Sequence, residues 1–304
     1  MDTAIIFQQM LILVLVMAVG FVIRRLKLID DVANGYLTKL LLRVTLPATL
    51  LSAISGSTLE VPLGSVFFLF AIIALSFVVM AVPSWLFPFA FRTKRNERGA
   101  FIAMGLFGNV NFMGIPLANA FFGPDGMFYA ILYNIVFNLL IFSLGMKLIG
   151  GERAKLSAKF FLSPVMIAAV TSVTLFLLDI QLPYVAASGL RLVGGVTTPI
   201  AMMLLGSILG AMNFKEMFRG WRVYAVTAVR LIVAPVLVFL VFLPFSLSPL
   251  LLPVILVMSA SPMAISTATF TIHYDTHQEL VGKGIFISTL LSVLTMPLLL
   301  SFLL

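Results

Sequence analysis

Ten long apolar runs, separated by short clusters of charge and by turn residues, constrain this chain more than any other feature of its sequence. A helix needs roughly 20 apolar residues to cross the hydrocarbon layer of a membrane, whereas a membrane barrel uses strands of about 10 residues with alternating polarity. The runs are long enough for helices and lack that alternation. We therefore predict membrane-spanning helices at about 4–23, 37–55, 63–91, 99–122, 127–149, 161–180, 184–211, 222–245, 248–272 and 281–304.

The composition excludes a water-soluble enzyme. Hydrophobic residues make up 62% of the 304 positions and charged residues 10%, whereas a soluble domain carries roughly 45–50% and about 25%. The net charge of +8 does not indicate binding to nucleic acid, because the basic residues form short clusters between apolar runs, as membrane proteins use them to set orientation. Cysteine is absent, which excludes disulfides, a thiolate nucleophile and a cysteine-ligated metal.

The basic residues alternate between the two sides of the predicted membrane. Fifteen of the 19 lie in or beside the odd-numbered loops, namely Arg24, Arg25, Lys27, Arg92, Lys94, Arg95, Arg98, Lys147, Arg153, Lys155, Lys159, Lys215, Arg219, Arg222 and Lys283. Arg191 alone is assigned to the even loops and the termini. A basic bias marks cytoplasmic loops, so we expect a multi-pass protein of the inner (plasma) membrane with both termini outside. Asp2 precedes the first run and Arg24 follows it, the reverse of a secretory leader.

The two halves of the chain match weakly at a fixed offset. Val44-Thr45-Leu46-Pro47 recurs 152 residues later as Val196-Thr197-Thr198-Pro199, and Phe122-Gly123-Pro124-Asp125 precedes Ile272-His273-Tyr274-Asp275 by 150. Five spans are an odd number, so the second half enters the membrane from the opposite side. The pattern favours two inverted repeats, 1–152 and 153–304, an architecture of many secondary transporters. The alternative is chance similarity among apolar segments.

Two spans carry residues that interrupt helices. The fourth contains Gly105, Gly108, Asn109, Asn111, Gly114, Pro116 and Asn119, and the ninth contains Ser259, Ser261, Pro262, Ser266, Thr267 and Thr269. Irregular backbone at membrane depth survives inside protein or beside water. We predict two discontinuous helices that meet near the midplane, where helix N-termini and free N–H groups suit an anion. The alternative is a pair of kinked packing helices with small residues at helix contacts.

The first interruption, GNVNFMGIPL (108–117), resembles the signature of the auxin efflux carrier family, which includes plant auxin exporters and bacterial malate- and malonate-type carriers. The segments SPMAISTATFTIHYD (261–275), VRLIVAPV (229–236) and LPATLLSAI (46–54) are similar to further parts of that family. The resemblance implies an all-α fold of ten transmembrane helices in two inverted five-helix repeats with crossed, broken helices 4 and 9. It also implies a scaffold (about 4–55 and 161–211), often dimeric, and a transport domain (about 63–149 and 222–304) that moves like an elevator.

The plant branch carries Pro followed by Asn or Gln at each crossover, and this chain departs from that pattern. Gly108-Asn109 lacks the proline, and Pro262-Met263 lacks the amide. These departures, and the absence of a long cytoplasmic loop, favour the bacterial branch. They leave the crossover itself intact, because glycine also opens a helix.

The expected substrate-binding residues surround these interruptions. They are Gly108, Asn109, Val110, Asn111, Ser261, Pro262 and Met263, together with Asn134 and Asn138, which share one helix face because they lie one turn apart. Intramembrane Arg230 and Arg43 could balance an anionic substrate or snorkel toward the cytoplasmic surface. Asp125 and Asp275 could couple protons or be solvated loop acids. His273 and His277 have no third ligand, so we expect neither a metal nor a cofactor.

The leading hypothesis is therefore a secondary transporter for a small organic anion, a mono- or dicarboxylate such as malate or malonate, or an auxin-like acid. The expected partners are this anion, protons or sodium as coupling ion, the lipid bilayer and a second copy of the chain in a homodimer. The alternatives are a sodium-coupled carrier like the bile-acid symporters, a channel, and an intramembrane enzyme. Sodium would need several oxygen ligands where the ninth span offers hydroxyls, and an enzyme would need an acid or histidine in mid-span, where the sequence has none.

Overall fold

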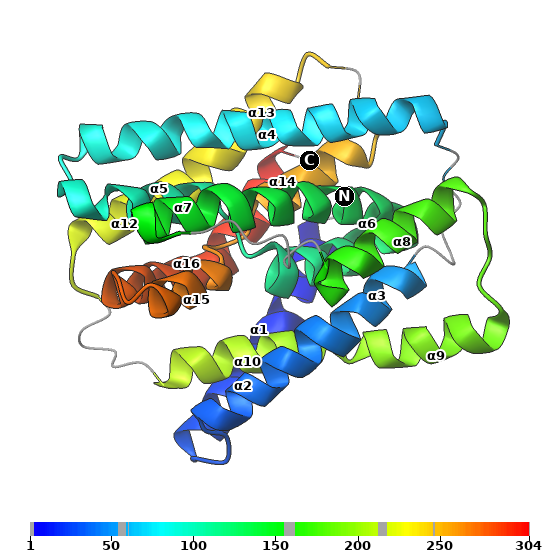
Figure 1. The fold of residues 1–304 in the computed structure, drawn as a ribbon, viewed down its shortest axis with the longest axis horizontal. Coiled ribbons are helices and arrows are strands. Elements are labelled where there is room, and N and C mark those ends of the chain that lie inside the picture. Colours follow the sequence, from blue (N-terminus) through cyan, green and yellow to red (C-terminus); the bar gives the residue numbers. More distant parts are fainter. Residues whose placement is uncertain are drawn as a thin grey trace. The chain divides into compact units, whose positions relative to one another are not determined.

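The computed structural model describes residues 3–53, 59, 61–154, 162–211, 218–245 and 247–303, and these fold almost entirely as helices (Figure 1). Five helical stretches of the described residues are long and apolar enough to cross a membrane: Gly64–Ala90, Val110–Arg153, Tyr184–Ala211, Trp221–Phe242 and Gln278–Leu303. Two shorter apolar helices are Pro164–Leu177 and Leu251–Ala260. The all-helical prediction is thus confirmed for the described residues, while ten separate spans and the inverted repeat stay predictions.

The chain divides into two compact units. The first comprises Met1–Phe70, Asn111–Ile135 and Ala158–Met212, and the second comprises Ala71–Val110, Val136–Ser157 and Asn213–Leu304. Each unit therefore combines segments from both halves of the sequence. They are described one at a time below.

Most helices of the first unit lie in its first and third segments, Met1–Phe70 and Ala158–Met212. They are α1 (Thr3–Arg25), α2 (Asp31–Leu40), η1 (Leu41–Thr45), α3 (Leu46–Ala53), α8 (Pro164–Leu177), α9 (Tyr184–Gly195) and α10 (Thr197–Ala211). α1 and α10 pack along each other (Figure 1). A Cβ added to Gly206 of α10 would lie 1.8 Å from the Met17 carbonyl oxygen of α1. Glycine thus lets two backbones touch, as small residues do at helix contacts in membranes.

The second predicted span, 37–55, begins earlier in the structure. α2 starts at Asp31, because the side chain of Asp30 accepts a hydrogen bond of 2.7 Å from the backbone N–H of Ala33 and caps the helix. α2, η1 and α3 then follow one another without a break to Ala53. The sequence prediction missed this first part because its residues are largely polar. Residues 54 and 55 of the predicted span lie outside the described residues.

The remaining helices lie in the second unit or are shared between the two units. They are α4 (Leu63–Ala90), η3 (Arg95–Glu97), α5 (Arg98–Leu106), η4 (Val110–Gly114), α6 (Ile115–Leu140), η5 (Ile141–Gly145), α7 (Met146–Gly150), η6 (Gly151–Arg153), α12 (Trp221–Ala228), η8 (Val229–Val233), α13 (Ala234–Phe242), α14 (Leu251–Ala260), α15 (Ile265–His273) and α16 (Gln278–Leu303). The first residues of α4, and η4 and α6 from Asn111 to Ile135, belong to the first unit.

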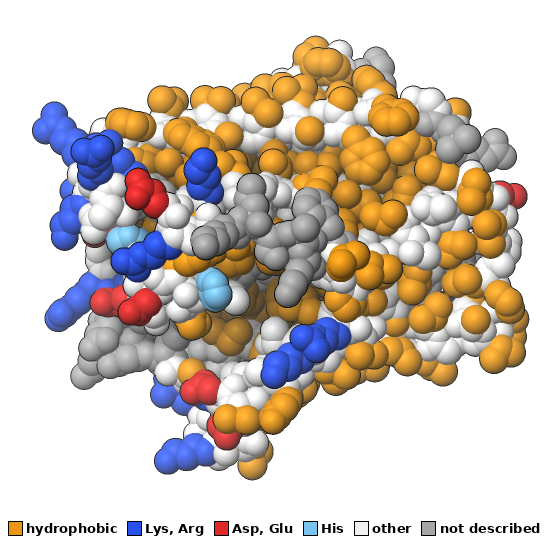
Figure 2. All heavy atoms as spheres, viewed as in Figure 1, with side chains coloured by type: hydrophobic (Ala, Val, Ile, Leu, Met, Phe, Trp, Pro, Cys, Tyr) orange, Lys and Arg blue, Asp and Glu red, His pale blue; other side chains and the backbone are white. Residues whose placement is uncertain are grey.

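α4 has the surface expected of a helix in contact with lipid. Val78, Val82, Leu86 and Phe89 are more than half exposed, and apolar side chains run along α4 in the space-filling view (Figure 2). Such a continuous exposed apolar face marks a membrane or protein contact.

The predicted boundary between the fourth and fifth spans, 99–122 and 127–149, falls inside α6, where two helices meet at Gly123, whose φ of 60° and ψ of −155° are not helical. The predicted seventh span, 184–211, consists of two helices in the structure, because α9 ends at Gly195 and α10 begins at Thr197. Lys155, Lys159 and Lys215, which contribute to the predicted charge bias, lie outside the described residues.

Among the described residues, four short stretches of five residues each form π-helix: η1, η4, η5 and η8. π turns are rare in proteins and occur often at functional sites. η4 follows the first predicted interruption, and η8 carries Arg230.

Candidate functional site

Both predicted helix interruptions are present. α5 ends at Leu106, and Phe107 takes an extended conformation (φ −97°, ψ 116°) before η4 begins at Val110. α14 ends at Ala260, and Ser261 is likewise extended (φ −61°, ψ 146°) before α15 begins at Ile265. Pro262 has no N–H with which to continue α14. The alternative of continuous, merely kinked helices is therefore wrong at these two places.

The two interruptions meet inside the second unit. Gly108 and Met263 form an antiparallel bridge. The Asn109 N–H donates to the Pro262 carbonyl at 2.6 Å, and the Ala264 N–H donates to the Phe107 carbonyl at 3.0 Å. A short two-stranded crossing thus replaces the helical hydrogen bonds that both helices lose at this point.

Arg230 lies against this crossing and is completely buried, with 0% of its surface exposed. Its Nε donates to the Ser261 carbonyl at 3.0 Å, and Nη1 donates to the Leu106 carbonyl at 3.1 Å. Longer contacts of 3.5 Å reach the carbonyls of Gly105 and Met258. One guanidinium therefore caps the last turns of both α5 and α14.

This capping has an electrostatic consequence. The C-terminus of a helix carries roughly half a negative elementary charge. Two such ends together offset the single positive charge of Arg230, which favours the burial of an arginine here. The N-terminus of α15, which starts at Ile265 on the other side of the break, carries the opposite sign.

Two sequence predictions about the crossing need correction. Snorkelling of Arg230 is wrong, since the residue is buried and bound to backbone carbonyls. Free N–H groups are also absent at four of the predicted positions. The N–H of Asn109 donates to the Pro262 carbonyl, that of Val110 to the Gly108 carbonyl, that of Ser261 to the Met258 carbonyl, and that of Met263 to Ser288 Oγ at 3.0 Å.

Gly108 is where Arg230 leaves no room for a side chain. A Cβ at this position would lie 2.0 Å from Arg230 Nη2 and 2.4 Å from Ser261 Oγ. Glycine in place of the plant-branch proline is thus a packing requirement of this crossing.

Four buried asparagines follow the first interruption: Asn109, Asn111, Asn134 and Asn138 are exposed by 2%, 7%, 0% and 3%. In the first unit, Asn134 Nδ2 donates to Asn111 Oδ1 at 2.6 Å. Asn109 and Asn138 belong to the second unit. Buried amides can both donate to and accept from a polar solute, and they add no net charge.

The remaining predicted charged residues lie elsewhere. Arg43 is exposed on η1 in the first unit, and Asp125 is half-buried just after the kink at Gly123. Asp275 is exposed, has a positive φ of 49°, and accepts a hydrogen bond from Gln278 Nε2 at 3.1 Å. Within the described ranges, no group of three or more His, Cys, Asp or Glu side chains could hold a metal ion.

The sequence prediction missed Ser288 and Met80. Ser288 on α16 binds the Met263 N–H, and Met80 Sδ on α4 lies 3.5 Å from Arg230 Nη1. Both residues are ordinary members of apolar spans, so no local signal marks them.

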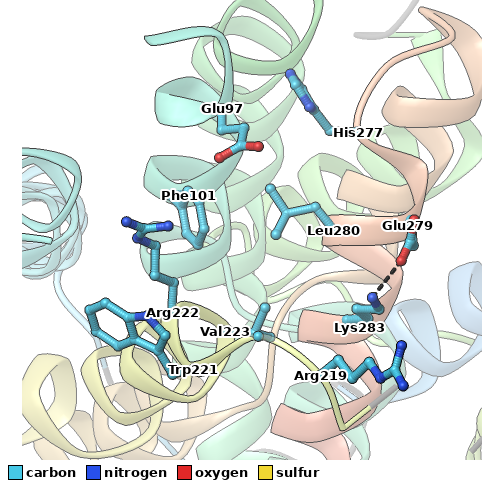
Figure 3. Close-up of a pocket in the computed structure, with 11 residues that line it drawn as sticks. Glu97, Phe101, Arg219, Trp221, Arg222, Val223, His277, Glu279, Leu280 and Lys283 are labelled. Atoms are coloured by element: carbon cyan, nitrogen blue, oxygen red, sulfur yellow. Dashed lines mark hydrogen bonds and ion pairs between the residues drawn. The ribbon is translucent and has the colours of Figure 1, made fainter. Parts of the chain in front are cut away.

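A pocket of about 380 Å³ opens at another place in the second unit (Figure 3). Its walls include Glu97, Trp221, Arg222, Glu279 and Lys283. Lys283 forms a salt bridge with Glu279, and Arg222 Nε donates to the Phe91 carbonyl at 3.1 Å. Charges of both signs therefore line this pocket, and two of its three Lys and Arg side chains, Arg222 and Lys283, are engaged in these bonds.

Comparison with known proteins adds a family match and two relatives. The model of a family described as membrane transport protein matches residues 5–160 and again 154–300. An uncharacterized transporter of Methanocaldococcus jannaschii is 24% identical over 297 residues, which cover 95% of this chain and 96% of the relative. An uncharacterized transporter of Methanothermobacter thermautotrophicus is 27% identical over 194 residues, which cover 62% and 63%.

Proposed function

We propose, from the premise that this chain belongs to the membrane transport protein family, that it is a secondary transporter which moves a small organic anion across the membrane. Membership confirms the resemblance to the auxin efflux carriers. The family supports transport, and the substrate class is our proposal. We take it to be a mono- or dicarboxylate such as malate or malonate.

The observation that carries this proposal is the crossing of the two interrupted helices in the second unit. Arg230 offsets the negative ends of α5 and α14, so the positive N-terminus of α15 is left without a matching negative helix end there. An anion is favoured at such a place. We propose that Gly108, Val110, Ser261, Pro262 and Met263 shape the backbone of the site.

The amide side chains supply the polar contacts in this proposal. Asn109 and Asn138 of the second unit are buried, and an amide N–H₂ can donate to a carboxylate. Asn111 and Asn134, which are bonded to each other in the first unit, stay predictions from the sequence. Loss of the Asn109 amide should therefore weaken binding more than loss of an exposed asparagine.

The movement we propose is an elevator-type alternation of access. The division into two compact units supports it. The predicted scaffold ranges 4–55 and 161–211 fall in the first unit, and most of the predicted transport-domain ranges, 63–149 and 222–304, fall in the second. Residues 63–70 and 111–135 are grouped with the first unit instead.

The membrane setting belongs to the same proposal. The family and the apolar helices indicate a multi-pass membrane protein. We propose the inner membrane, with the basic loops in the cytoplasm, both termini outside, and a homodimer joined through scaffold helices. For energy coupling we propose protons or facilitated movement, with sodium as the competing choice.

Uptake into proteoliposomes tests the proposal. The protein is reconstituted and offered radiolabelled malonate, malate or indole-3-acetate, with sodium and proton gradients imposed in separate experiments. Uptake of one anion above that of empty liposomes is expected, and Asn109→Ala should abolish it while the protein still elutes as one folded species. Asn96→Ala, which removes an exposed asparagine on η3, is the matched control.

Two outcomes contradict the proposal. Failure of the wild-type protein to accumulate any of the three anions counts against the substrate class. Wild-type rates in Asn109→Ala count against the site. Dependence of uptake on a sodium gradient alone would replace proton coupling with the sodium-coupled alternative.

A further inference from the structure

A separate pocket of about 460 Å³ lies within the first unit. Its walls come from α3, the first part of α6, α9 and α10. The lining residues are Thr49, Ser52, Ala53, Asn119, Pro124, Arg191, Gly194, Gly195 and Thr198. This volume is typical of small-ligand sites.

Arg191 gives the pocket its charge. It is exposed, and it is the one ionisable side chain among the nine lining residues. The three salt bridges found among the described residues, all at other positions, do not involve it. Asp125 follows Pro124 in the chain but does not line the pocket. The formal charge on the lining of this cavity is therefore positive only, whereas charges of both signs line the pocket with Lys283 and Glu279.

The other walls offer neutral polar groups. Ser52, Asn119 and Thr198 bring two hydroxyls and an amide. The Thr49 hydroxyl lies 2.9 Å from the Gly194 carbonyl and 2.8 Å from the Thr197 hydroxyl, and so joins α3 to α9 and α10. The wall that carries Arg191 is thereby fixed against the wall that carries Ser52. A guanidinium flanked by neutral donors suits a carboxylate, whose two oxygens match its planar fork.

The position of Arg191 in the sequence points the same way. It is the single basic residue that the charge pattern assigns to the outer side of the membrane. Basic residues on the cytoplasmic side set the orientation of membrane helices. An arginine on the outer side does not serve that purpose, so its presence needs another explanation. A role in contact with an anionic solute accounts for it.

We propose that this pocket is a second anion site, distinct from the helix crossing, in which Arg191 binds a carboxylate of a small organic acid at the outer side. The inference rests on the proposed function for the identity of the ligand. It does not rest on it for the existence of the site, which can be tested without transport.

The chain has no cysteine, so one substitution creates a unique thiol. Ala53→Cys places it in the pocket wall. The protein, in nanodiscs of phosphatidylcholine alone, is treated with a negatively charged and a positively charged methanethiosulfonate reagent. We expect the negative reagent to react faster, and the ratio of the two rates to fall about fivefold when Arg191→Gln is added, because one nearby charge attracts one reagent and repels the other.

Two controls accompany this measurement. Arg191→Lys keeps the charge and should keep most of the ratio. Gly64→Cys places a thiol in open space elsewhere in the first unit, and its ratio should stay the same when Arg191→Gln is added. An Ala53→Cys ratio that does not respond to Arg191→Gln overturns the proposal.

Protection identifies the ligand class. Malonate, malate or indole-3-acetate at millimolar concentration should slow the labelling of Ala53→Cys at least threefold, and Arg191→Gln should remove this protection. Inorganic phosphate at equal ionic strength should protect less. Equal protection by phosphate, or none by the three carboxylates, overturns the assignment to a carboxylate.

The uptake assay separates this inference from the proposed function. If the wild-type protein takes up none of the anions, the proposed function is contradicted, regardless of the labelling rates of Ala53→Cys. If uptake is normal but the ratio of the two labelling rates of Ala53→Cys does not change with Arg191→Gln, the second anion site is wrong and the proposed function stands.

Discussion

Gly108 and Arg230 occupy the same small space at the helix crossing, and a single Cβ on the glycine would lie 2.0 Å from the arginine Nη2. They are 122 positions apart in the sequence. The glycine is therefore required by a side chain that the local sequence does not reveal. The first three predictions below test this relationship.

Gly108→Ala is expected to lower the free energy of unfolding by about 1–3 kcal/mol, because the guanidinium is held by carbonyls and cannot move aside without losing hydrogen bonds. Gly108→Leu should lower it further. Thermal unfolding of the purified protein in detergent measures the change. Gly35→Ala, which meets nothing within 4 Å, is the control and should be neutral or slightly stabilising. Equal unfolding temperatures for Gly108→Ala and Gly35→Ala would refute the clash.

Arg230→Lys is expected to destabilise the protein, because an ammonium cannot reach the Ser261 and Leu106 carbonyls in the way that the guanidinium fork does. Arg230→Leu should be worse still, since the helix ends lose their compensating charge; loss of bonds from a charged donor costs about 1.5–3 kcal/mol each. The yield of monodisperse protein and its unfolding temperature report the effect. Arg43→Leu, on an exposed arginine, should have little effect, and comparable losses in both variants would contradict the capping role.

A double-mutant cycle tests the pair more directly. Gly108→Ala combined with Arg230→Lys should cost less than the two single changes added together, with a coupling of more than about 0.5 kcal/mol, because the lysine relieves part of the clash. Strict additivity would show that the two residues do not share their space.

The sequence predicts the interruptions but not what holds them. Gly108, Pro262 and the asparagines are local signals, and they correctly locate both breaks. Arg230 is visible as an intramembrane charge, but its partners, Leu106 and Ser261, are 124 and 31 positions away. Which carbonyls end near it depends on how whole helices pack. The expectation of bare N–H groups failed for the same reason, since Ser288 and the opposite strand satisfy them.

The predicted helix boundaries were wrong where the first residues of a helix are not apolar. The start of α2 is set by the polar cap Asp30, outside any apolar run. The turn signal Gly123-Pro124-Asp125 was a better guide, because two helices meet at Gly123, whose φ of 60° is not helical, at the predicted boundary between two spans.

The hydrogen bond between Asn111 and Asn134 is expected to contribute about 0.5–1.5 kcal/mol to stability. Asn111→Ala and Asn134→Ala should each destabilise the protein, and the double variant should be no worse than the more harmful single one. Unfolding temperatures of the three variants measure this. Additive losses would show that the two amides act separately.

The contact between α1 and α10 should tolerate no side chain at Gly206. Gly206→Val places a Cβ 1.8 Å from the Met17 carbonyl oxygen, and overpacking of this kind costs about 1–3 kcal/mol or more. Gly189→Val, which meets nothing within 4 Å, is the control. Unfolding temperatures that fall equally in both variants would point to the intrinsic cost of valine in a helix.

The π turn at Val229–Val233 ties the direction of the Arg230 side chain to a single surplus residue. Successive residues of an α-helix are about 100° apart around its axis. If that turn tightened to ordinary α-helix, everything on one side of it would rotate by roughly that angle relative to the other, and the guanidinium would swing away from both helix ends at once. A change between π-helix and α-helix in this one turn would then make or break the hydrogen bonds of Arg230 to α5 and α14 at the same time.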